Sequence, residues 1–222
     1  MTINGAVNKT GILLALATLS AGYVWHLYFS GNSGAAMPLA MAGMIVGSIL
    51  AMVIIFKKTW AGLLAPAYAL AEGLLIGGVS SVFEQRYHGI VIPAVMLTLG
   101  TLCALLGAYR MGFIRASQGF VRGVVAATGG ICLVYIASLV LRLFGVNMSI
   151  INDSGPFSIL FSLVVVVVAA LNLVIDFAVI EEGARSGAPK YMEWYAAFGL
   201  MLTLVWLYLE FLKLLAKLNR RN

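Results

Sequence analysis

Carboxylates are the residues of this sequence whose types and positions point to chemistry, and there are eight of them in an otherwise apolar chain. Asp176 lies inside the run at 164–183, VVVVVAALNLVIDFAVIEEG, which is long enough to cross a membrane. An ionisable side chain at the centre of a membrane helix costs about 2.5–3.5 kcal/mol on insertion scales, so chains that keep one use it for ions, protons or structural pairing. We therefore interpret Asp176 as part of a proton-sensitive cation site. The alternative is a structural carboxylate bonded to a neighbouring helix.

Three glutamates are candidate partners of Asp176. Glu72 lies about twelve residues into the third apolar segment, which places it roughly 18 Å along that helix and near the midplane. Glu193 flanks the connection that follows the Asp176 segment. Glu210 lies roughly 28 Å along the last helix if that helix begins near Tyr191, or at the depth of Asp176 if the helix begins ten residues later. The sequence leaves open which of the three is the partner.

Other patterns limit the classes of function. Gly73 and Gly77 form a G-x-x-x-G spacing in the third segment, which predicts close helix packing. The chain contains no HExxH, CxxC, G-x-S-x-G or P-loop motif, so we expect no enzyme and no resident cofactor.

The composition is that of an integral membrane protein. Of the 222 residues, 62% are hydrophobic and 10% are charged, whereas a soluble domain carries about 25% charged residues. The uninterrupted apolar runs predict helices, in an all-α bundle of seven spans that forms one transmembrane domain over 1–222. The net charge of +6 comes from bases in loops and the tail, so we expect the lipid bilayer as partner and no nucleic acid. The spans are expected at about 10–29, 38–56, 60–82, 90–109, 121–143, 156–180 and 191–217.

The distribution of lysine and arginine predicts a cytoplasmic N-terminus. With that orientation, eight bases lie in inner segments, and only Arg86 and Arg142 lie in outer loops. The basic C-terminal tail breaks this bias if all seven helices cross. Either the tail faces outward, or the last helix is re-entrant and returns inside.

Several strings resemble a known family. They are LVIDF at 173–177, LYLEF at 207–211, YALAEGLLIGGVSSVFE at 68–84 and GAPKYMEWYAAFG at 187–199. They look like the Bax inhibitor-1 (TMBIM) family, in its bacterial YccA-like branch, and the resemblance covers nearly the whole chain from the second span onward. It implies six helices wrapped around a central seventh, in the bacterial cytoplasmic membrane, as a monomer or weak oligomer.

The resemblance also implies a function, a pH-sensitive calcium leak gated by an aspartate on each of the last two helices. Asp176 matches the first aspartate. Glu210 matches the second by its local string, with a glutamate in place of the aspartate and a longer connection before it. Lys57 matches a basic residue that latches the sixth-helix aspartate, and Glu72 takes the place of an acidic residue of the second helix. Asp176 and Glu210 would then bind calcium transiently.

The physics of such a pair suggests a gate. Calcium prefers several oxygen ligands, and two close carboxylates cannot both ionise cheaply. Protonation would tighten a hydrogen-bonded closed state, and deprotonation or a cation would separate the helices. The second function that the resemblance implies is a membrane-embedded regulator of a membrane-anchored ATP-dependent protease, which would then be a protein partner.

Overall fold

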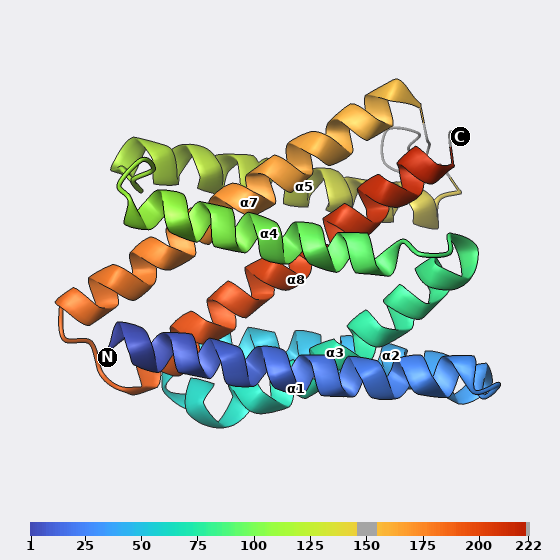
Figure 1. The fold of residues 1–222 in the computed structure, drawn as a ribbon, viewed down its shortest axis with the longest axis horizontal. Coiled ribbons are helices and arrows are strands. Elements are labelled where there is room, and N and C mark those ends of the chain that lie inside the picture. The colour runs from blue at the N-terminus through green and yellow to red at the C-terminus, as the bar shows by residue number, and fades with distance from the viewer. Residues whose placement is uncertain (146–154, 221–222) are drawn as a thin grey trace. The chain divides into compact units, whose positions relative to one another are not determined.

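The structure is a computed structural model that describes residues 1–145 and 155–220, and over these residues it consists of helices joined by short connections, without strands (Figure 1). Seven α-helices are long and apolar enough to cross a membrane, as the sequence predicts. They are α1 (Ile3–Phe29), α2 (Ser33–Phe56), α3 (Ala61–Arg86), α4 (Val91–Arg110), α5 (Gln118–Leu143), α7 (Pro156–Arg185) and α8 (Tyr191–Asn219), with a short 3-10 turn, η1 (Lys58–Trp60), before α3.

Most helices extend beyond the apolar segments that predict them, because polar end residues cap or continue a helix without adding hydropathy. The α1 helix begins at Ile3 rather than Thr10, and the Thr2 side chain caps it by accepting a hydrogen bond from the Gly5 amide at 3.0 Å. The α2 helix begins at Ser33, so Pro38 lies inside it. The α7 helix continues to Arg185, five residues past its expected end.

Packing divides the chain into two compact units. Unit 1 contains Met1–His88 and Ala178–Leu202, and unit 2 contains Gly89–Phe177 and the chain from Thr203 onward. The α7 and α8 helices therefore each contribute one part to each unit.

In unit 1, α3 packs against both α1 and α2. Glycines make this approach possible. A Cβ at Gly73 would collide with the backbone of Ala17, and one at Gly77 with the backbone of Ala21, both on α1. The close packing predicted from the G-x-x-x-G spacing is thus confirmed.

In unit 2, a core of Ile131, Val165 and Val168 is covered by Tyr135, Phe161 and Trp206, which brings together α5, α7 and α8. The contacts set the helix directions. Along α5, Thr128 contacts Asn172 of α7 and Tyr135 contacts Phe161 of α7, so the two helices are antiparallel. Along α8, Thr203 contacts Asp176 of α7 and Lys217 contacts Ser162 of α7, so these two helices are antiparallel as well. Towards their carboxyl ends, α5 and α8 therefore run in the same direction, and α7 runs opposite to both.

The last helix is continuous. It has 29 residues and is therefore about 43 Å long, which exceeds the thickness of a bilayer core of about 30 Å. It begins at Tyr191, so Glu210 lies roughly 28 Å along it, as expected for a helix that begins there. It also has the largest share of buried residues among the seven spans. The arrangement of six helices around it stays a prediction.

Candidate functional site

Asp176 has an incompletely satisfied carboxylate inside a membrane-length helix. It belongs to unit 2, nine residues before the end of α7 at Arg185. The hydroxyl of Thr203, on α8, hydrogen-bonds to this carboxylate. The second oxygen, Oδ2, is buried and has no hydrogen-bond partner among the residues that the structure describes. A buried polar atom without a partner carries a free-energy cost, which makes it a candidate functional atom.

The neighbours of Asp176 are either already bonded or aromatic. One turn earlier on α7, the Asn172 amide donates to the Thr128 hydroxyl and to the Val168 carbonyl, both at 2.8 Å. Phe177, the next residue, lies against Tyr109 of α4 with 5.8 Å between ring centroids. Asp176 and Thr203 therefore supply oxygen atoms next to an amide that is already hydrogen-bonded and an aromatic pair.

Glu210 has a different environment. It is 1% exposed, and both of its carboxylate oxygens accept a hydrogen bond from the Tyr135 hydroxyl at 3.0 Å. Lys213, one turn later on α8, forms an ion pair with it at 2.9 Å. The pairing with Lys213 that the i, i+3 spacing permits is therefore present. Glu210 is a satisfied buried carboxylate.

Asp176 and Glu210 are not at the same level along the helices. Thr203, the partner of Asp176, precedes Glu210 by seven residues on α8, which is two turns or about 10 Å. Asp176 on α7 and Glu210 on α8, which the family resemblance pairs, therefore each have hydrogen-bond partners of their own. Across 1–145 and 155–220, no group of three or more His, Cys, Asp and Glu side chains is placed to hold a metal ion.

Glu72 lies in unit 1, on α3, and is half-buried. Its carboxylate hydrogen-bonds to the side chain of Tyr68, one turn earlier. Gly47 of α2 faces it, and a Cβ at Gly47 would lie 3.2 Å from Oε2 of Glu72. The absence of a side chain at Gly47 therefore leaves room for this carboxylate between α2 and α3.

Lys57 caps the carboxyl end of α2, in unit 1. Its side chain is exposed, and its ammonium group lies 4.6 Å from the centroid of the Trp60 ring. The contact is a cation–π interaction, worth about 0.5–1 kcal/mol at an exposed site. The latch between Lys57 and Asp176 stays a prediction.

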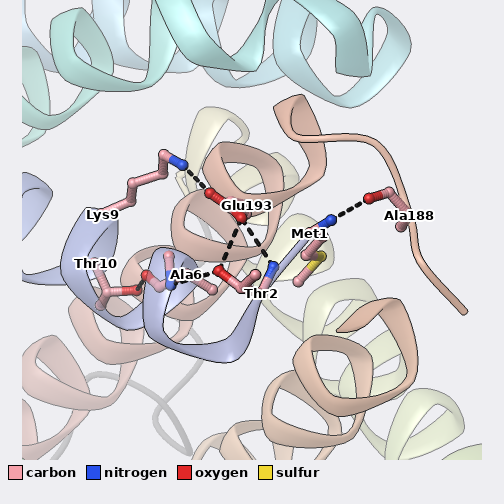
Figure 2. A network of polar contacts seen from close by, with 8 residues as sticks. Met1, Thr2, Ala6, Lys9, Thr10, Ala188 and Glu193 are labelled. Atoms are coloured by element: carbon pink, nitrogen blue, oxygen red, sulfur yellow. Dashed lines mark hydrogen bonds and ion pairs between the residues drawn. The ribbon is translucent and has the colours of Figure 1, made fainter. Parts of the chain in front are cut away.

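Glu193 is engaged in a network that the sequence did not reveal (Figure 2). It lies in the first turn of α8 and is 4% exposed. Its carboxylate accepts hydrogen bonds from the Thr2 amide at 2.8 Å and the Thr2 hydroxyl at 3.1 Å, and it forms an ion pair with Lys9. Glu193 therefore fastens the start of α1 to the start of α8.

A further polar contact in unit 2 also escaped the sequence interpretation. Lys217, near the end of α8, donates to the Ser162 hydroxyl at 2.7 Å and to the Ser158 carbonyl at 3.3 Å. The two serines are one turn apart near the start of α7. That i, i+4 spacing was the available signal, but it does not reveal which helix lies opposite.

Comparison with known proteins gives one family. A family model described as Bax inhibitor 1 like matches residues 1–220. No curated protein and no solved structure matches the chain.

Proposed function

The chain belongs to the Bax inhibitor-1-like family, and from this and the surroundings of Asp176 we propose that it is a pH-sensitive calcium leak channel gated by a buried carboxylate. The observation that carries the proposal is the buried, unpartnered Oδ2 of Asp176 within a membrane-length helix. Such an atom is costly unless a proton or a cation joins it at some stage of its function.

The chemistry of this site suits a hard cation. Calcium binds six to eight oxygen atoms from carboxylates, carbonyls, hydroxyls and water. Asp176 supplies a carboxylate and Thr203 supplies a hydroxyl oxygen. The remaining ligands would be water or backbone carbonyls, so binding is weak. Weak binding is what permeation requires, because an ion must leave the site as readily as it enters.

The gate follows from the charge of Asp176. When the carboxyl group is protonated it is neutral, and it exchanges a single hydrogen bond with Thr203 across the contact between α7 and α8. When it is ionised, its uncompensated oxygen attracts water or a cation, which favours separation of the two helices. Calcium flux should therefore rise as pH rises and protons leave the site.

The other sequence candidates take different roles in this scheme. Glu210 is compensated by Lys213 and Tyr135 and holds α5 against α8, so we assign it to structure rather than to the gate. Glu72, beside Tyr68 and Gly47 in unit 1, is a second candidate carboxylate for binding a cation. We further propose a bacterial cytoplasmic membrane as location, with the N-terminus inside.

Calcium efflux from liposomes that contain only the purified protein tests the proposal. Efflux is recorded at about pH 6 and about pH 8, with protein-free liposomes as the control. We expect efflux above that control, greater at the higher pH.

Absence of efflux at both pH values would contradict the leak. It would favour the second function that the family resemblance implies, a regulator bound to a membrane-anchored ATP-dependent protease. In that case Asp176 would be a structural residue.

A further inference from the structure

A groove on unit 2 is lined by residues other than Asp176 and its partner Thr203. It has a volume of about 360 Å³ and is lined by one face of α5, from Thr128 to Leu139, and by Trp206 of α8. Its floor adjoins the core of Ile131, Val165 and Val168. All of these residues belong to unit 2.

The groove offers a ligand almost no hydrogen bonds. Of its two hydroxyl-bearing residues, Thr128 already accepts from Asn172, and Tyr135 already donates to Glu210. The remaining lining is aliphatic, thiol or indole. From Thr128 to Leu139 the α5 face extends over about 16 Å, close to the roughly 15 Å thickness of one leaflet of the hydrocarbon core. This length and lining match a lipid acyl chain.

One end of the groove is positively charged. Arg142, which is exposed, follows Leu139 by three residues and so continues the groove face at the carboxyl end of α5. Lys213 lies over the ring of Tyr135, with its ammonium 4.9 Å from the centroid, and its side chain is 44% exposed. Because α5 and α8 run in the same direction here, Lys217 and Arg220 lie towards this end too.

Acidic groups balance little of this charge. Glu210 pairs with Lys213 and so offsets one of these positive charges. In the part of unit 2 that the structure describes, the bases near this end therefore outnumber the carboxylates. A basic end above an apolar groove of leaflet length is complementary to an anionic headgroup and its acyl chain.

We propose that this groove binds one acyl chain of an anionic phospholipid, with the lipid phosphate against Arg142. This proposal requires no calcium transport. Each cation near an anionic headgroup increases binding about fivefold.

Trp206 provides a local probe. In a variant that retains it as the single tryptophan, with Trp25, Trp60 and Trp194 replaced by phenylalanine, lipids brominated on the acyl chain quench its fluorescence on contact. Quenching is titrated in liposomes with brominated phosphatidylglycerol and with brominated phosphatidylcholine of the same chain length. We expect brominated phosphatidylglycerol to reach half-maximal quenching at a mole fraction at least about fivefold lower than brominated phosphatidylcholine does.

Substitutions on α5 separate a specific site from general attraction. In the same background, Arg142→Gln should reduce the preference for the anionic lipid about fivefold, and Arg142→Lys should retain most of it. Arg122→Gln, at an exposed arginine near the start of the same helix, should leave this preference unchanged. Equal quenching by both lipids, or equal loss in the Arg142→Gln and Arg122→Gln variants, would overturn the proposal.

Discussion

Asp176 and Glu210 are both acidic residues of membrane-length helices, but their carboxylates differ in how completely they are hydrogen-bonded. Glu210 has a lysine and a tyrosine hydroxyl bonded to its carboxylate. Asp176 has a threonine hydroxyl, and its second oxygen has no partner within the part of the chain that the structure describes. A buried charge that is paired and hydrogen-bonded is stable where it is, and an incompletely bonded one invites a proton or an ion. Within the proposed leak, this contrast favours Asp176 over Glu210 as the gating residue.

Glu193 is another compensated carboxylate. Its side chain is 6% exposed and that of Lys9 is 19% exposed, so the ion pair between them is largely removed from solvent. Removing one member of a buried pair leaves the other charge uncompensated, which is more costly than removing the charges of both. This pair can therefore be tested by a double-mutant cycle.

We predict that Lys9→Met lowers the free energy of unfolding by about 3 kcal/mol. Adding Glu193→Gln should restore most of the lost free energy of unfolding, because the neutral amide oxygen still accepts a hydrogen bond from the Thr2 amide. Equilibrium unfolding in mixed detergent micelles measures both variants. Lys190→Met, at an exposed lysine just before α8, is the control. A double variant no more stable than Lys9→Met alone would contradict the prediction.

The position of α3 within unit 1 depends on the close approach of α1 and α2 to its glycines. At Gly77 an added Cβ would meet the backbone of Ala21, which cannot rotate away as a side chain can. The helices would have to separate, and overpacking of this kind costs about 1–3 kcal/mol. Gly22, the next residue on α1, has open space around its Cβ position.

We therefore expect Gly77→Ala to lower the free energy of unfolding by about 1–3 kcal/mol. Gly22→Ala should leave stability unchanged or raise it slightly, since alanine favours helix by up to about 1 kcal/mol. Thermal unfolding in detergent compares the two alanine variants directly. Equal stability of the two would show that α1 and α3 are not in the close contact described.

The existence and order of the helices were accessible from the sequence because hydropathy over a bilayer length is a strong local signal. The start of α1 and the end of α7 could not be predicted in this way, because polar caps and terminal turns do not add to the hydropathy signal. The spacing of Gly73 and Gly77 predicted a close helix contact, but it did not indicate that the contacting helix is α1. The contacts of Glu210 with Tyr135 and of Glu193 with Thr2 join residues 75 and 191 positions apart, so no local pattern could predict them.

The whole molecule is a membrane-spanning helical protein of the Bax inhibitor-1-like family, and within residues 1–145 and 155–220 Asp176 has a buried carboxylate oxygen without a hydrogen-bond partner. The family membership and the helices are established by the match and by the structure. The leak and its control by protons are the proposal, which requires that the response to pH depends on Asp176 and not on the surface carboxylates.

The most direct test is the ratio of calcium efflux at about pH 8 to that at about pH 6, in liposomes, for wild type and Asp176→Asn. Glu182→Gln is the matched control, since it removes an exposed carboxylate from the same helix, one paired with Arg185 at 3.2 Å. We expect a ratio well above one for wild type and Glu182→Gln, and a ratio near one for Asp176→Asn, because the amide cannot ionise. An Asp176→Asn variant with the ratio of wild type would contradict the carboxylate gate.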